Sequence, residues 1–291
     1  MRAARLAILA FVPLLLAATP QESWQKGIAG QNEAYSKRPH AMLKIQDSVY
    51  LGEGERAVLQ GRKGDASSWR WNDKPGARGP LRLSIKGGKL SVVHNGKPVE
   101  TAQLQKSIVI DANVDISGQP TQVGAGIEGW RIFVYNQLHP AAKAFKSVSY
   151  FPYDPAFRVT ARFAPNPRPA ARVFRTSMGT DKQFYHAGDA IFRLKGKDVR
   201  LPLYSGERDP KRLAGMSAFF TDDLSNKLTY GAGRYLDAEP FGAFPPQSVT
   251  LDFNNAYNPN CALSPHFTCP LAVDEIALDV RAGEKAPPGK H

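Results

Sequence analysis

Both cysteines of the 291-residue chain lie in one short stretch, "NNAYNPNCALSPHFTCPLAVDE", residues 254–275. Cys261 and Cys269 are eight positions apart, with His266 between them. Three chemistries fit this spacing. The cysteines can form a disulfide, they can supply two ligands of a metal site completed by His266 and Asp252, or one of them can be a nucleophilic thiol whose pKa is lowered by His266 or Arg234.

The neighbouring polar residues extend the candidate site. Residues 249–253 alternate as a strand does, so Asp252 and Asn254 are expected on the same side, toward the cysteine loop. Arg234 lies in "GAGRYLD", where glycines allow close backbone approach, and a bidentate Arg234–Asp252 pair is expected. A salt bridge that only fixes the loop is the structural alternative. The candidate ligand-binding residues are Arg234, Asp252, Asn254, Tyr257, Asn258 and His266.

The amino terminus reads as a secretory signal peptide. Arg2 and Arg5 precede an apolar run from Leu6 to Ala18, which is too short to span a bilayer comfortably. We predict cleavage near Ala18, export to the periplasm or the extracellular space, and no integral membrane association afterwards; an uncleaved membrane anchor is the alternative. Disulfides persist in those compartments. We therefore predict that Cys261 and Cys269 form a disulfide that shapes the loop without taking part in chemistry.

Several function classes lack their sequence signals. The formal charge of +12 is scattered, without a basic block interleaved with aromatic residues, so no nucleic-acid partner is expected. H-E-x-x-H, G-x-S-x-G, P-loop and C-x-x-C motifs are absent. "GAGIEG", residues 124–129, matches the dinucleotide fingerprint but leads directly into a strand, so we interpret it as a loop. No cofactor and no metal site is predicted.

Short alternating segments and turn signals predict a mostly β fold. Residues 81–104 contain two hairpin signals, Gly87-Gly88 and Asn95-Gly96, with a third strand expected over Val99–Leu104. Another hairpin is predicted to turn at Gly196-Lys197. Further strands are predicted over 130–136 and 158–163, and one helix over 21–38.

These elements predict two β subdomains, an amino-terminal sandwich and a carboxy-terminal sandwich or barrel, with one short amino-terminal helix. The expected boundaries are a signal peptide over 1–18, a helix and linker over 19–39, the first subdomain over 40–145, the second over 146–285 and a disordered tail over 286–291.

Two longer motifs carry a family resemblance. "TYGAGRYLD" is followed by "VTLDFNNAYNPNCALSPHFTCPLAVDEIALDVRAGEK", and "FPYDPAFRVTARF" lies upstream. This pattern resembles the domain of unknown function 1684 family, closely over residues 229–285 and loosely over about 40–228. The resemblance implies a β-rich body whose amino-terminal part is similar to a forkhead-associated sandwich. It implies no assigned function.

We therefore keep three hypotheses open. The first is an exported binding module that holds an unidentified small or oligomeric ligand in a pocket of the carboxy-terminal subdomain. The second is a periplasmic hydrolase that uses Asp252 as acid or base and Arg234 to orient an anion. The third is a structural or interaction protein of the cell envelope.

Overall fold

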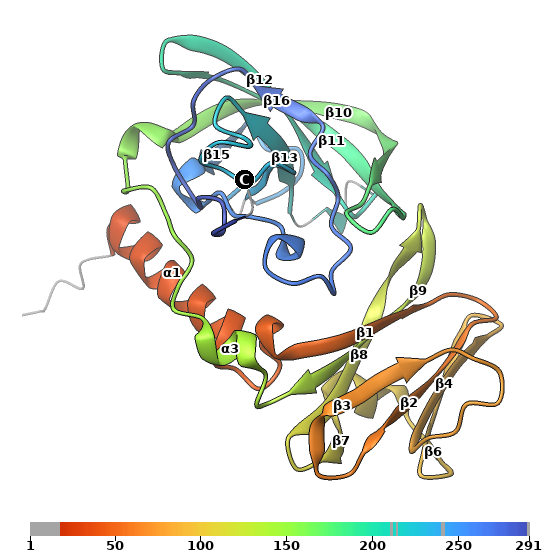
Figure 1. The fold of residues 1–291 in the computed structure, drawn as a ribbon. Coiled ribbons are helices and arrows are strands. Elements are labelled where there is room, and N and C mark those ends of the chain that lie inside the picture. The colour runs from red at the N-terminus through yellow and green to blue at the C-terminus, as the bar shows by residue number, and fades with distance from the viewer. Residues whose placement is uncertain (1–17, 210–211, 214, 240–241, 290–291) are drawn as a thin grey trace, which may run out of the picture.

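The computed structural model describes residues 18–209, 212–213, 215–239 and 242–289 (Figure 1). It is mostly β, as the sequence predicts. The helices are α1 (Pro20–Ser36), α2 (Thr101–Lys106) and α3 (Pro140–Ala144). The strands are β1 (Ile45–Leu51), β2 (Arg56–Arg62), β3 (Asp65–Asn72), β4 (Leu81–Lys86), β5 (Lys89–His94), β6 (Lys97–Val99), β7 (Ile108–Asp111), β8 (Val114–Gly124), β9 (Ile127–Asn136), β10 (Arg158–Arg175), β11 (Asp181–Leu194), β12 (Lys197–Ser205), β13 (Ser217–Asp222), β14 (Arg234–Asp237), β15 (Ser248–Asp252) and β16 (Asp274–Ile276).

The amino-terminal strands form a sandwich of two sheets. One sheet has the order β1-β9-β8-β7 and the other β3-β2-β4-β5-β6. Their inner faces share one apolar core, to which Leu59 and Leu81 contribute from one sheet and Ile116 and Ile132 from the other. Burying alternate residues of both sheets in this way is the usual means of stabilising a sandwich.

The carboxy-terminal strands form one curved sheet, a half-barrel, in the order β14-β13-β12-β11-β10-β15, with β16 parallel to β13. Its concave face holds the largest apolar cluster, centred on Phe220, Phe253 and Leu251. The chain from Ile276 to Ala282 packs into the same cluster. This segment therefore closes the open side of the half-barrel.

Helix α1 begins where its sequence provides a cap. Thr19 and Glu22 form a capping box, and Pro20 occupies the first turn, where its missing N–H costs nothing. The carboxy-terminal end of α1 lies beside α3 (Figure 1), and nearer its start the Trp24 indole N–H donates to the Asn254 carbonyl over 2.8 Å. The predicted signal peptide lies outside the described residues except for Ala18.

The predicted hairpins are present, with two differences. Residues Asn95 and Gly96 both have positive φ, as a type I′ turn requires. The β11–β12 turn is formed by Lys195 and Gly196, which also have positive φ, one residue before the predicted Gly196-Lys197, because Lys197 is already paired in β12. The strand expected over Val99–Leu104 is wrong. It ends at Val99, and α2 follows, because the segment after it is rich in good helix formers.

Contacts also join the sandwich to the half-barrel. "GAGIEG" is the turn of the β8–β9 hairpin, and Gln122 beside it exchanges two hydrogen bonds with the main chain of Gln183 on β11, of 2.8 and 3.0 Å. Ala286, in the segment predicted as a disordered tail, is buried and its N–H donates to Leu228; residues 290–291 lie outside the described part. Within the described residues, no helix is both long and apolar enough to traverse a bilayer.

Candidate functional site

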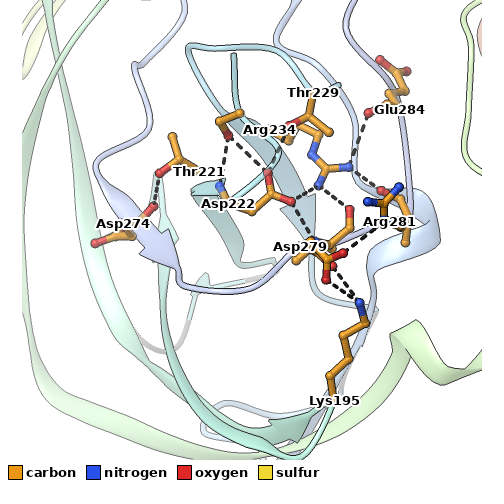
Figure 2. A network of polar contacts seen from close by, with 12 residues as sticks. Lys195, Thr221, Asp222, Thr229, Arg234, Asp274, Asp279, Arg281 and Glu284 are labelled. Carbon is orange, nitrogen blue, oxygen red and sulfur yellow. Dashed lines mark hydrogen bonds and ion pairs between the residues drawn. The ribbon is translucent and has the colours of Figure 1, made fainter. Parts of the chain in front are cut away.

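Arg234 is the centre of a buried polar network (Figure 2). It is 1% exposed, and its Nη2 lies 3.0 Å from the Asp222 carboxylate. The same guanidinium donates to the main-chain carbonyls of Val280, Ala282 and Glu284. Arg234 therefore ties the closing segment to the half-barrel and does not reach a ligand.

The sequence reasoning about the glycines before Arg234 is confirmed. Gly233 has φ +89°, and a Cβ at this position would lie 2.7 Å from the carbonyl oxygen of Phe220. A side chain would collide with the backbone of β13, so glycine permits the close strand approach that delivers Arg234 to the interior.

Asn258 belongs to a second buried network, around Glu284. Glu284 is fully buried and accepts hydrogen bonds from the Asn258 N–H at 2.9 Å, the Tyr150 hydroxyl at 2.9 Å and Gln31 at 3.0 Å. Burial raises the pKa of this carboxyl to about 7, against the lowering effect of its donors. Because Gln31 is on α1, this network fastens the helix to the carboxy-terminal segment.

Asp252 belongs to a third group, which opens to solvent. Antiparallel pairing places Arg158 of β10 directly opposite Asp252 of β15, so both side chains lie on one face of the sheet. Arg158 Nε is 3.7 Å from Asp252 Oδ2, and Arg158 Nη2 is 2.6 and 2.8 Å from the two oxygens of Glu239. The Arg234–Asp252 pair expected from the sequence does not form.

These side chains line a pocket of about 310 Å³ beside α1. Asp252 is 4% exposed and is held in place by Asn254, whose N–H and side-chain amide both donate to Asp252 Oδ1. Trp24 supplies the aromatic part of the lining, and its ring packs against that of Tyr153, with 5.5 Å between the ring centroids. The remaining lining residues are Ala18, Pro20, Ser23 and Asn255.

The other two candidate residues lie elsewhere. The Tyr257 hydroxyl faces Asp237 at 3.3 Å, and its main chain pairs with that of Tyr235. His266 lies against the sandwich, where its Nδ1 is 3.3 Å from the Ser48 hydroxyl and its carbonyl accepts a 3.0 Å hydrogen bond from Tyr50. Burial lowers the pKa of His266. The six candidates therefore divide among separate environments.

The cysteines lie next to each other but are not bonded. Both are free in the structure, and the Cys261 N–H donates to the Cys269 sulfur over 3.3 Å. The predicted disulfide is therefore absent, although the pair is adjacent. Among the described residues, no group of three or more His, Cys, Asp and Glu side chains is placed to hold a metal ion.

Sequence reasoning missed Trp24, Arg158, Glu239 and Asn255 as pocket residues. Arg158 lies in the upstream motif "FPYDPAFRVTARF", which was a usable signal. The Glu239 main-chain N–H donates a 2.9 Å hydrogen bond to the Thr250 carbonyl of β15. No pattern in the neighbouring sequence predicts such a contact.

Comparisons with known proteins add a family. No curated protein matches this chain. A solution NMR structure of an uncharacterized protein of Haloarcula marismortui is 30% identical, with a TM-score of 0.43, over 51% of this chain and 80% of that one. Residues 143–285 match the family model described as "Protein of unknown function (DUF1684)". The chain therefore belongs to the DUF1684 family.

Proposed function

We propose that the protein is an exported binding module that holds a small organic cation in the pocket of Trp24, Arg158, Glu239 and Asp252. The observation that carries the proposal is the position of Asp252, whose almost fully buried carboxylate forms part of the wall of a polar pocket beside an aromatic ring. Pockets of a few hundred Å³ with few polar anchors are typical of small-molecule sites.

The charges of the pocket favour a cation. Arg158 faces both Glu239 and Asp252, so two carboxylates share one guanidinium and one negative charge is left over. In a partly desolvated site this excess attracts a positive ligand more strongly than it would in water. Glu239 is the more exposed of the two carboxylates, so a ligand reaches it first.

The Trp24 ring narrows the chemical class of the ligand. An indole ring is the best side chain for contact with an organic cation. Trp24 is fixed by the hydrogen bond from its ring N–H to Asn254, so its ring is preorganised. Ser23 and Asn255 add polar groups for a hydroxyl or amide of the ligand. The proposed ligand is therefore an amine or quaternary ammonium compound that also carries a polar group.

Export is supported by the apolar run over Leu6–Ala18, and helix α1 begins at Pro20, directly after that run. Thr19, the first residue after the proposed cleavage, caps α1, and its N–H lies 2.7 Å from a Glu22 oxygen. Cleavage there would remove Ala18 from the edge of the pocket. It would also convert the Thr19 amide into an ammonium group paired with Glu22, so the helix start would persist in the mature protein.

Calorimetric titration of the mature protein with choline tests the binding proposal, with the neutral isostere 3,3-dimethylbutanol as ligand control. We expect choline to bind with a dissociation constant in the millimolar range and 3,3-dimethylbutanol not to bind. Asp252→Asn keeps the oxygen that accepts from Asn254 and is expected to weaken binding about tenfold, or about 1.4 kcal/mol. Asp279→Asn, at an exposed carboxylate elsewhere, is the matched control and should leave binding unchanged. Absence of choline binding, or equal binding by Asp252→Asn, would overturn the proposal.

A further inference from the structure

The two thiols lie where three parts of the chain meet. Cys261 is in the short helix η5 (Asn260–Ala262), and Cys269 directly precedes Pro270. Both pack in the same cluster as Tyr35 of α1 and Phe133 of the sandwich. Cys269 is 7% exposed, whereas Cys261 is only partly buried. A reagent from solution therefore meets Cys261 first.

The surroundings of the two sulfurs differ. The Cys261 main-chain N–H donates to the Cys269 sulfur over 3.3 Å, so the two thiols are neighbours. The side chains of Cys269, Ser177 and Tyr230 are hydrogen-bond partners of the Cys261 sulfur. These contacts stabilise a thiolate and lower the pKa of Cys261 to about 6, despite partial burial. The side-chain hydrogen bond of Cys269 to Cys261, its burial and the Cys261 charge, in that order, raise the pKa of Cys269. Near neutral pH the pair is thus one thiolate beside one thiol.

The ammonium group of Lys182 interacts with the buried Cys269 thiol. The Lys182 side chain lies close enough to Cys269 for its charge to lower the pKa of that thiol. Burial and the nearby Arg131 guanidinium lower the pKa of Lys182 itself. The positive charge of Lys182 therefore favours loss of the Cys269 proton when Cys269 acts as a nucleophile.

We propose that Cys261 and Cys269 form a thiol–disulfide exchange site that is oxidised by a low-molecular-weight disulfide. The partly exposed Cys261 thiolate attacks one sulfur of the disulfide, whose S–S bond breaks and releases one thiolate. Cys269 then loses its proton to solvent and attacks the Cys261 sulfur, which displaces the second thiolate. Two protein thiols are oxidised and the disulfide is reduced to two thiols. Burial of Cys269 excludes a bulky protein partner from direct attack on that sulfur.

The reaction would stiffen a contact between the two β parts. The loop between the cysteines carries the hydrogen bonds of His266 and Thr268 to Tyr50 on β1, of 3.0 and 3.3 Å. A disulfide across this loop would restrict its conformations. The disulfide predicted from the sequence is the product of this exchange, and the free thiols are its reduced state. This site is independent of the cation pocket, so either proposal can fail alone.

Reaction of the reduced protein with oxidised glutathione, quenched by acid and followed by intact mass, tests the order of attack. We expect the wild type to form an internal disulfide. Cys269→Ser should accumulate one glutathionyl group on Cys261, and Cys261→Ser should react at least about tenfold more slowly because Cys269 is buried. In urea the two variants should react at equal rates. Equal rates in the folded variants, or attachment first at Cys269, would overturn the assignment.

The pH dependence of alkylation supplies a second measurement. The alkylation profile is measured in the wild type, because Cys269→Ala would remove the hydrogen bond between the two cysteine side chains. Peptide mapping identifies which cysteine is alkylated at each pH. We expect a midpoint for Cys261 well below the value of about 8.5 for free cysteine. Tyr230→Phe removes one hydroxyl and should move that midpoint upward, whereas Tyr185→Phe, which loses a hydroxyl elsewhere, should not. A wild-type midpoint near that of free cysteine would also overturn the proposal.

Discussion

Replacing Arg234 by methionine tests whether this residue is structural. The substitution keeps an unbranched apolar stem but removes the guanidinium that pairs with Asp222 and donates to three carbonyls of the closing segment. Asp222 would keep hydrogen bonds from Ser225, Thr229 and the Val280 N–H. Its carboxylate would nevertheless stay buried without a counter-charge.

The magnitude follows from burial. Both side chains are at most 1% exposed, and breaking a buried ion pair by removing one partner costs about 3–5 kcal/mol. The same pair at the surface would contribute at most about 1 kcal/mol. We therefore expect Arg234→Met to lower the free energy of unfolding by about 3–5 kcal/mol. That is a large fraction of the stability of a typical domain.

Urea unfolding followed by circular dichroism measures this loss from the shift in midpoint at unchanged slope. Arg62→Met is the matched control, because Arg62 also pairs with a carboxylate, Asp65, but its side chain is 81% exposed. The double variant Arg234→Met/Asp222→Leu should recover part of the loss, since no unpaired charge remains. If Arg234→Met cost no more than Arg62→Met, the structural role would be refuted.

Two further outcomes are expected. Glu284 has its pKa raised from 4.5 to about 7 in the folded protein. The stability that its neutral form contributes is therefore complete below about pH 4.5 and is lost as the pH rises through about 7. The free energy of unfolding of the wild type relative to Glu284→Gln should fall by about 3 kcal/mol over that window, and a difference that is constant with pH would contradict this prediction. Amino-terminal sequencing of protein recovered from the exported fraction should identify Thr19 as the first residue. Exported protein that still begins at Met1 would contradict the proposed cleavage.

Local structure was predictable where a few neighbouring residues decide it. Asn95-Gly96 specifies a turn because both positions need positive φ, and Thr19 with Glu22 specifies the start of α1. The strand expected over Val99–Leu104 was wrong because a short segment with one buried leucine fits either a strand edge or a helix turn, and periodicity cannot separate them.

The pocket was only partly predictable because strand register creates it. Asp252 meets Arg158 through the pairing of β10 with β15, and these strands lie far apart in the chain. A shift of one residue in that pairing would turn one of the two side chains to the opposite face. Sequence alternation fixes which residues share a face of one strand, but it does not fix which residue of another strand lies opposite.

The division of the six candidates has a further physical cause. Asp252 and Asn254 remain together because η4 (Phe253–Asn255) follows β15 and uses Asp252 as its cap. Beyond this turn the chain pairs Tyr257 with Tyr235 and then sends Asn258 into the interior. A dense polar stretch in an irregular segment therefore supplies several buried networks, each of which satisfies main-chain groups that lack a strand partner. Polar density identifies an irregular closing segment, and only the residues that keep solvent access, such as Asp252 through its pocket, remain available for a ligand.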